Sequence, residues 1–520
     1  MSPIKTFIAL SSNRRPLSAR RGPSHQPLIL GMCLLLSACA VGPDYERPDI
    51  KSPEQFKENK GWVQAAPHAV STQGAWWTIF GDETLNALEP KVIQANQSLR
   101  ASYYAYQQAL ALTDVARAAE YPTLGVTASS TRSSFGGGAT TTTIGATGPS
   151  NVIAGKSVAF SASWVPDLWG KVRRQVESNE ANAEAGHDNL LAAQLSLQTT
   201  LAQSYFQIRQ VDSQIALAQG TVTAYEKFLQ LTQNRYVAGV ATKADVAQAQ
   251  SQLANAKVQL ASFNVQRPQL EHAIAVLIGE APANFNLPPM PSLPPPQAIP
   301  AGLPSQLLLR RPDLGASERQ VAAANALIGV AKSAYFPSLT LSAQRGWSSS
   351  STFSNLISAP NAFWSVGPSL AETLFEGGLR RAQVAQSENA YQQAVAQYRQ
   401  LSLQAFQQVE DQLAALSALF EEAQLQQQAV SAADESLRLA TNQYKAGTVS
   451  YLNVITAQAT AYTANNQNLL IAGQQLTANV ALIQALGGGW ENEAQPVGSG
   501  EGAKPAEKSS AAELHQAPDH

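Results

Sequence analysis

The chain has 520 residues, a formal net charge of −2 and a sequence pI near 6.3. It therefore lacks the basic character of a nucleic-acid-binding protein. Charged residues make up only 14% of the chain, well under the usual ~25%, so its polar surface is mostly uncharged. Two cysteines cannot supply a disulfide framework, and six scattered histidines leave little room for a metal site or a catalytic triad. We predict no nucleic acid partner, no metal and no enzyme activity.

Residues 1–38 have the pattern of a secretory signal. Five Lys or Arg residues and no acid precede a short apolar run, LILGMCLLL, at 28–36. This run is shorter than an ordinary membrane-spanning helix. The exit sequence LSAC at 36–39 resembles the bacterial lipobox, which implies that Cys39 becomes the first mature residue and carries an S-diacylglycerol and an N-palmitoyl chain. An ordinary signal peptide with an incidental cysteine is the alternative.

Several short motifs occur twice, in the same order and about 210 residues apart. NRYVAG at 234–239 matches NQYKAG at 442–447, and LSLQ at 195–198 recurs at 401–404. Chance would have to reproduce several matches in one register. The chain is therefore predicted to contain two copies of one unit.

The repeats and the changes in composition divide the chain into six segments. A Pro-rich stretch predicts an extended, semi-rigid linker between the copies, and the Gly-, Ala-, Glu- and Lys-rich end predicts a disordered tail. The segments are a signal peptide at 1–38, an N-terminal lipidated extension at 39–81, a first repeat at 82–281, the Pro-rich linker at 282–304, a second repeat at 305–488 and the tail at 489–520.

Each copy begins with a predicted helix, at 82–120 in the first and 312–335 in the second. Asp82 and Asp313 are suitable N-caps because their carboxylates accept from free N–H groups of a first turn. A proline follows each helix within two residues and ends it.

After each proline, apolar and small residues alternate with the period of two that predicts a β-strand. The apolar positions are Leu124, Val126, Ala128, Val158, Phe160, Ala162 and Trp164 in the first copy, and Leu339, Leu341, Ala343, Trp364 and Val366 in the second. The intervening residues are uncharged, which favours a membrane barrel with lipid outside and water inside. A half-buried soluble sheet has the same alternation and remains an alternative.

Proline-free windows at 167–267 and 369–495 follow the strands. Their apolar residues are spaced by threes, fours and sevens, the heptad pattern. These residues are Leu197, Leu201, Tyr205, Ile208, Ile215, Val222, Tyr225, Leu229, Leu403, Phe406, Leu413, Leu416 and Phe420. Each window is predicted to form a long helix and a returning helix, with the turns at Gly239 and Gly447. The first long helix, from Gly170 to Tyr236, would measure roughly 100 Å at 1.5 Å per residue.

The strand count requires an oligomer if the sheet is in lipid. Two strands per copy give four per chain, whereas the smallest common barrels have about eight. Open sheet edges are not tolerated in the hydrocarbon region. Several chains must then contribute to one barrel.

Three motifs carry a resemblance to a known family. GPDYERP at 42–48 follows Cys39, WWTIFGD at 76–82 precedes the first predicted helix, and RRPDL at 310–314 opens the second repeat. Over about residues 39–488 the sequence resembles the TolC-like outer-membrane efflux proteins, nearest the OprM/NodT-type lipoproteins of RND efflux systems.

The resemblance implies a mainly α fold with a transmembrane β-barrel, built from a duplicated unit of β-hairpin and long helix pair. Three protomers would form a twelve-stranded barrel that continues into an α-helical periplasmic tunnel. The implied partners are two further copies of the chain, outer-membrane lipid of a Gram-negative cell, a periplasmic adapter (membrane fusion) protein and an inner-membrane pump. No cofactor is implied apart from the lipid on Cys39.

The implied function is a passive, gated duct that exports drugs or toxic small molecules in a tripartite pump. The exit duct of a type I protein-secretion system is the alternative within the family. A periplasmic adapter is a different class, and the duplicated strand–helix unit argues against it.

The resemblance also implies that the periplasmic tips are the two helix turns. The residues assigned to these tips are Tyr236, Gly239, Asp245, Tyr444 and Gly447. Tyr236 and Tyr444 are expected to pack at the turns, whereas the direction of Asp245 is left open.

In the segment after the second turn, Leu452 matches the apolar residue that narrows the pore of similar proteins. An inter-helix packing role for Leu452 is equally compatible with the sequence. The position that is acidic in the family's motif is Thr456 here. A ring of threonines would neither hold cations nor repel itself, so an acidic gate is in doubt.

Overall fold

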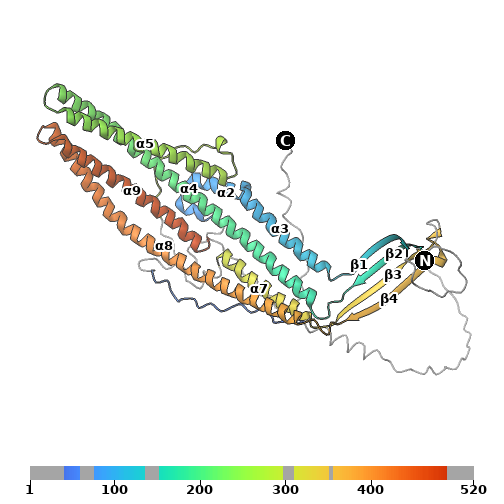
Figure 1. Cartoon of the computed structure of the whole chain (residues 1–520). Coiled ribbons are helices and arrows are strands. Elements are labelled where there is room, and N and C mark those ends of the chain that lie inside the picture. Colours follow the sequence, from blue (N-terminus) through green and yellow to red (C-terminus); the bar gives the residue numbers. More distant parts are fainter. Residues whose placement is uncertain (1–39, 59–74, 135–151, 297–309, 351–354, 489–520) are drawn as a thin grey trace, which may run out of the picture. The chain divides into compact units, whose positions relative to one another are not determined.

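The computed structural model describes residues 40–58, 75–134, 152–296, 310–350 and 355–488. They form two compact units, a sheet unit (within 40–43, 119–175 and 329–382) and a helical unit (within 44–118, 176–328 and 383–488). Long helices running side by side make up the helical unit, and four strands dominate the sheet unit (Figure 1).

The helices occur in pairs of equal length. Helices α4 (Lys171–Val237) and α8 (Leu379–Lys445) have 67 residues each, and α5 (Lys243–Leu277) and α9 (Tyr451–Ala485) have 35 each. Before the strands, α3 (Gln97–Ala118) and α7 (Pro312–Ser333) have 22 each. These matches agree with the duplication in the sequence. No helix in the described ranges combines the length and hydropathy needed to cross a bilayer.

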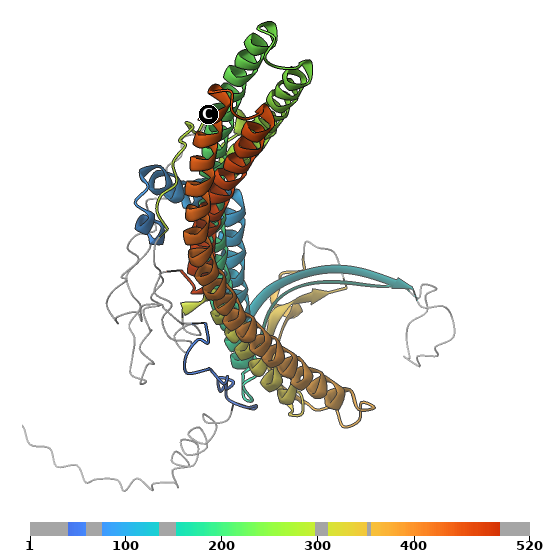
Figure 2. The same ribbon diagram turned by 90° about the vertical axis from the view of Figure 1, so that its left-hand side faces the viewer.

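The sheet is an antiparallel meander of four strands in the order β1-β2-β3-β4, which curve together in Figure 2. The strands are β1 (Thr123–Ser134), β2 (Val152–Trp164), β3 (Ser338–Ser349) and β4 (Ala362–Ala371). One register row joins Val126, Phe160, Arg345 and Trp364. Within the described residues, β1 and β4 are each paired on one side only. The predicted alternation is confirmed, because paired residues share a face and the apolar positions lie together.

The helical unit has a continuous apolar core where α2 (Glu83–Ala95), α4, α8 and α9 meet. Its fully buried members include Leu85, Val92, Leu201, Phe206, Ile208, Leu413, Leu476 and Val480. The short helix η1 (Trp76–Phe80) packs here too, with the ring centroids of Phe80 and Phe206 at 4.8 Å. Asp82 caps α2 as predicted, accepting from the N–H groups of Thr84 and Leu85. The heptad stripe therefore forms the core along most of its predicted length.

Two local expectations about the helices are wrong, one about the continuity of a helix and one about an N-cap. The helix predicted at 82–120 is broken at Asn96, whose side chain accepts from Leu99 N–H and donates to the Leu277 carbonyl. Asn96 thus starts α3 as a new helix. Asp313 does not cap α7, which begins one residue earlier; its carboxylate accepts from the Arg311 guanidinium and the Leu314 N–H.

Two residues of the predicted heptad stripe are not buried in the chain. Leu403 and Phe420 of α8 are exposed, whereas Phe406, Leu413 and Leu416 are buried. A helix of this length contacts its neighbours along a stripe that drifts around it, so some positions of a strict heptad face away from the chain's own core.

Candidate functional site

The two turns predicted at Gly239 and Gly447 have the same backbone geometry and lie at one end of the helical unit (Figure 1). Both glycines have positive φ, 75° and 79°, which favours glycine because it lacks a Cβ atom. In each turn the glycine N–H donates to the carbonyl three residues earlier, and the next N–H donates to the carbonyl five residues earlier. This is the Schellman pattern that ends a helix. We call the two turns and residues 228–249 and 440–456 around them the helix tip.

Tyr444 connects the two hairpins within the tip. It is 3% exposed. The Arg235 guanidinium donates from Nη1 to the Tyr444 carbonyl at 3.1 Å, and its central carbon lies 4.7 Å from the centroid of the Tyr444 ring. The Thr232 and Tyr444 hydroxyl oxygens are 3.4 Å apart. This Arg235–Tyr444 latch joins the end of α4 to the end of α8.

An apolar cluster continues from the latch into the start of α9. Tyr451, Val454 and Ile455 pack with Tyr444 and with Ala249 of α5, and the rings of Tyr444 and Tyr451 are 5.5 Å apart. Burial raises the pKa of Tyr451 to about 12, so its hydroxyl stays neutral. The tip is therefore held inside one protomer by aromatic packing and one guanidinium.

Leu452 and Thr456 lie outside this cluster. Leu452 is 63% exposed, and Thr456 is exposed with its hydroxyl donating to the Leu452 carbonyl at 3.0 Å. Four residues apart on one helix, they share a face. In the described part of the chain, both side chains are exposed and neither belongs to the apolar cluster of the helix tip.

Two other predicted tip residues differ from Tyr444 in environment. Tyr236, expected to pack, is 46% exposed. It is one residue around the helix from Arg235, which makes the contact with α8 instead. Asp245 closes a capping box with Thr242: its carboxylate accepts from the Thr242 N–H at 2.8 Å, and its own N–H donates to the Thr242 hydroxyl. Its role there is to start α5.

Sequence reasoning missed Arg235. The signal was present in the repeat itself, because Arg235 in NRYVAG aligns with Gln443 in NQYKAG. A charge that appears in only one of two otherwise similar motifs has a role that the duplication does not explain.

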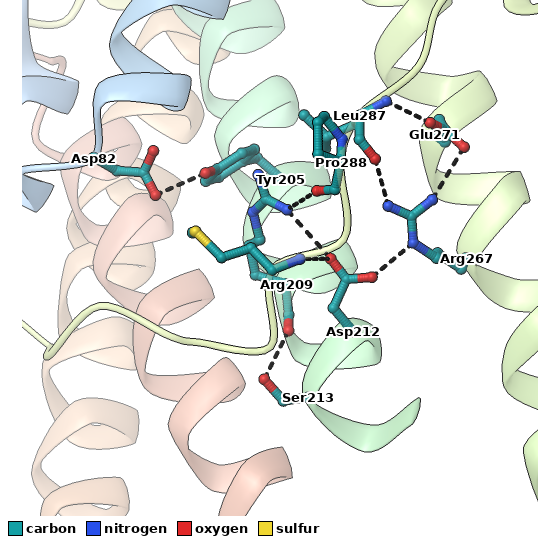
Figure 3. Close-up of polar contacts among 10 residues, drawn as sticks. Asp82, Tyr205, Arg209, Asp212, Ser213, Arg267, Glu271, Leu287 and Pro288 are labelled. Carbon is teal, nitrogen blue, oxygen red and sulfur yellow. Dashed lines mark hydrogen bonds and ion pairs between the residues drawn. The ribbon is translucent and has the colours of Figure 1, made fainter. Parts of the chain in front are cut away.

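A second missed feature is a buried ion network in the helical unit, centred on Asp212 (Figure 3). The Asp212 carboxylate accepts from Arg209 at 3.2 Å, from Arg267 of α5 at 2.6 Å and from the Met290 N–H at 2.9 Å. The side chains of Asp212 and Arg209 are 1% and 2% exposed. Arg209 also donates to the Pro288 carbonyl at 2.8 Å.

Arg267 and Glu271 extend the network along α5. Arg267 donates to Glu271 at 3.2 Å and to the Leu287 carbonyl at 2.5 Å, and Glu271 accepts from the Leu287 N–H at 2.6 Å. Four charged side chains, those of Arg209, Asp212, Arg267 and Glu271, thus bind the backbone of 287–290 to the α4–α5 pair (Figure 3). On the other side of Arg209, Tyr205 donates to Asp82 at 2.7 Å. The network fixes where the chain leaves the first repeat.

Glu89 is a buried acid without a partner in the described part of the chain. It is 0% exposed, and neither carboxylate oxygen has a hydrogen-bond donor there. Burial raises its pKa to about 9. Burial without a donor therefore favours the protonated form of Glu89 at neutral pH.

The remaining site prediction, lipidation of Cys39, lies outside the described residues. Among the residues that are described, no group of His, Cys, Asp and Glu side chains has the arrangement of a metal site.

Two repeats, each with a long helix hairpin and two strands of an antiparallel sheet with one apolar face, define a channel protein of the outer membrane. Comparison with known proteins identifies its family. The family model described as outer membrane efflux protein matches residues 88–280 and 303–488. The chain belongs to this family, whose members are channels and not enzymes.

Individual relatives cover almost the whole chain. The chain is 30% identical over 469 residues to the pyoverdine export outer membrane protein OpmQ of Pseudomonas aeruginosa, covering 90% of this chain and 97% of the relative. It is 29% identical over 468 residues to the cation efflux system protein CusC of Escherichia coli O6:H1, covering 88% and 98%. The solved outer-membrane channel OprN is 27% identical and has a TM-score of 0.79, covering 86% of this chain and 99% of that one. The resemblance found in the sequence, the fold class and the outer-membrane location are confirmed.

Proposed function

We propose that three copies of this chain form the outer-membrane duct of a tripartite, RND-type efflux pump. The duct exports drugs or toxic small molecules that an inner-membrane pump delivers through a periplasmic adapter. The observation that carries the proposal is a four-stranded sheet with an apolar face and two half-paired edges, joined in sequence to long paired helices.

The strand count supports an oligomer, and the resemblance to the family supports three copies. The outer strands β1 and β4 each leave one edge for pairing, and an unpaired edge is not tolerated in lipid. Edge-to-edge pairing of three chains gives twelve antiparallel strands, an even number within the range of membrane barrels. The exposed Leu403 and Phe420 on α8 also favour burial against a neighbouring copy, because large apolar side chains in a heptad pattern form helix interfaces.

The class of cargo is set by the pump rather than by the duct. OpmQ is a pyoverdine exporter by name and CusC a cation efflux protein, yet both are about equally similar to this chain. A passive duct has no chemistry of its own with which to select between such cargoes. The proposal of drugs or toxic small molecules therefore concerns the class of pump, and the particular substrate depends on the partner.

We place the gate at the helix tip. Under threefold symmetry the exposed Leu452 side chains would meet near the axis, where an apolar constriction closes a pore by dewetting. Thr456, one helical turn after Leu452 on the same face of α9, would line the pore with an uncharged hydroxyl group. The Arg235–Tyr444 latch holds the end of α4 against the end of α8. Tyr444 also packs against Tyr451 of α9, so breaking the latch would let α9 move as well. A helix contact with two such arrangements can act as a switch.

Replacing Leu452 with alanine is expected to widen the closed pore. The change removes an exposed apolar group and leaves the packed residues Tyr451 and Val454 untouched, so the fold is retained. We expect a rise in single-channel conductance and leak in planar bilayers. The matched control is Leu439→Ala, which truncates an exposed leucine of α8. Unchanged conductance and leak in the Leu452 variant would remove the gate assignment.

Replacing Cys39 with alanine is expected to abolish lipid labelling. A lipobox cysteine is the sole acceptor of the anchor, and each buried CH₂ of its chains contributes about 0.8 kcal/mol of membrane affinity. The measurement is incorporation of radioactive palmitate in cells. Cys33→Ala, inside the predicted signal peptide, is the matched control and should label normally. Normal labelling of the Cys39 variant would refute lipidation at this residue.

The function itself is tested by accumulation of a fluorescent efflux dye. Cells lacking the chain are compared with cells re-expressing it, with and without an uncoupler of the pump's energy supply. Accumulation that rises on loss and falls on rescue, only in energised cells, supports the efflux duct. A loss of secreted proteins without any change in dye would favour the type I secretion alternative.

A further inference from the structure

All the charged residues of the four strands are cations, and all lie on the apolar face of the sheet. Within their described bounds, the strands contain Arg132, Lys156 and Arg345 and no acid. Arg345 is in register with Phe160 and Trp364. Lys156 comes four residues before Phe160 on β2, and Arg132 comes six residues after Val126 on β1. Residues an even number apart on a strand share a face, so both cations lie on the same face as Phe160 and Val126.

The cations lie in the half of the face nearest the hairpin connections. Lys156 pairs with Ser349 at the end of β3, and Arg132 pairs with Ala154 near the start of β2. Arg345 is four residues from Ser349, about 13 Å along the strand. The other half contains the strand ends that are joined in sequence to the helices, and it carries only apolar groups on this face, among them Leu339, Leu341, Leu370, Leu124 and Trp164. The distribution of charge along the strands is therefore one-sided.

Arg345 is one of the residues that line a hollow in the sheet unit. It has a volume of about 760 Å³, and most of its lining is apolar, including Phe160, Trp364, Val126, Leu124, Ala162 and Ala343, with Ser161 and Gln344 as further polar residues. The side chains of Phe160, Val126 and Trp364 are more than half exposed. The hollow thus combines a guanidinium with apolar walls, which suits a ligand with an anionic head and a hydrocarbon chain.

We propose that this face binds a phosphorylated, multiply acylated glycolipid of the outer leaflet, with its phosphates on the three cations and an acyl chain in the hollow. The inference rests on the proposed function, in which the apolar face meets lipid and the helices extend into the periplasm. The hairpin ends of the strands then face the cell exterior, so the cations lie in the outer leaflet.

The physical reason is the cost of placing the Arg345 guanidinium in lipid. A guanidinium on the lipid face of a barrel is destabilising unless it reaches the interface or finds a partner. Arg345 comes two residues before Trp347 in β3, so it is about 7 Å farther from the hairpin end along the strand. To reach the interface, its side chain has to extend toward the hairpin end. A phosphate there accepts two parallel hydrogen bonds from arginine.

The spacing of the cations favours a glycolipid with two phosphates. Arg345 and Lys156 are separated by about 13 Å along the strands and lie on adjacent strands. A glycerophospholipid with one phosphate reaches only one end of this row, whereas phosphates at the two ends of a disaccharide reach both. Arg132, one strand further, adds a third contact.

The test measures binding of lipid A to the full-length trimer in detergent by native mass spectrometry. The variant is Arg132→Gln/Lys156→Gln/Arg345→Gln, and the control with the same charge change is Arg100→Gln/Lys227→Gln/Lys257→Gln on the helices. We expect at least tenfold weaker binding of diphosphoryl lipid A by the strand variant, and wild-type binding by the control. Arg345→Lys keeps the charge but not the paired hydrogen bonds, so its affinity for diphosphoryl lipid A should lie between those of the wild type and the strand variant.

Further probes separate the possible sources of phosphate. Monophosphoryl lipid A and phosphatidylglycerol are expected to bind the wild type at least tenfold more weakly, and inorganic phosphate should not compete. Binding of lipid A by the strand variant within twofold of the wild type would overturn the proposal, as would equal binding of phosphatidylglycerol or displacement by inorganic phosphate.

Trimer mass and channel conductance of each variant are recorded in parallel. Conducting trimers with unaltered lipid A binding in the strand variant refute this inference alone and leave the efflux duct standing. A wild-type chain that forms neither trimers nor channels refutes both.

Discussion

Replacing Asp212 with alanine is expected to lower the free energy of unfolding by about 3–5 kcal/mol, the usual cost of removing one partner from a buried ion pair. The Asp212 carboxylate accepts from Arg209, Arg267 and the Met290 N–H. Its loss leaves the Arg209 guanidinium, 2% exposed, without its counter-charge. The measurement is chemical denaturation of the purified protein in detergent, followed by circular dichroism.

Local proteolysis distinguishes release of the linker from a general loss of stability. Asp212 holds the Met290 backbone directly, and Arg209 and Arg267 hold those of Pro288 and Leu287, so the variant should be cut near 287–290 before the helices unfold. The control is Glu435→Ala, which breaks the exposed Glu435–Arg438 pair and should leave the transition nearly unchanged, because exposed pairs contribute little. A wild-type transition and cleavage pattern for Asp212→Ala would contradict the network's structural role.

The architecture was predictable because its signals are periodic and repeated. Heptad spacing and Gly239 and Gly447 predict helix pairs of these lengths, and alternation predicts the strands. The break at Asn96 was not predictable, since an asparagine within an amphipathic stretch is compatible with a continuous helix. It becomes a cap only because the Leu277 carbonyl lies within reach of its amide.

The interior polar groups could not be predicted for a related reason. Arg209 and Asp212 have the i, i+3 spacing of a surface pair, and nothing local indicates that they are buried. Their burial depends on Arg267, on α5, and on the backbone at 287–290, which the fold brings together. Arg345, in contrast, lies in a visible alternation with Leu341 and Ala343, and its place on the apolar face is a consequence of that pattern.

The buried carboxyl of Glu89 is expected to make the protein less stable as pH rises. Burial raises the pKa of this carboxyl in the folded protein to about 9 from its ordinary value of 4.5. Between these values the folded state holds a proton that the unfolded state has released, so the free energy of unfolding falls with increasing pH. The slope is about 1.4 kcal/mol per pH unit, which amounts to about 4 kcal/mol between pH 5 and pH 8. Below pH 4.5 both states are protonated and the effect vanishes.

Glu89→Gln isolates this contribution, because glutamine has nearly the shape of the protonated acid and does not titrate. The variant and the wild type should have similar stability at pH 5, and the variant should be the more stable by several kcal/mol at pH 8. Glu83→Gln makes the same charge change at an exposed position of the same helix and should keep the wild-type pH dependence. Equal slopes for all three proteins would mean that Glu89 is ionised in the fold, and hence that a cation or donor reaches it. The sign of the difference at pH 8 thus decides whether the core of the helical unit holds an acid or a carboxylate.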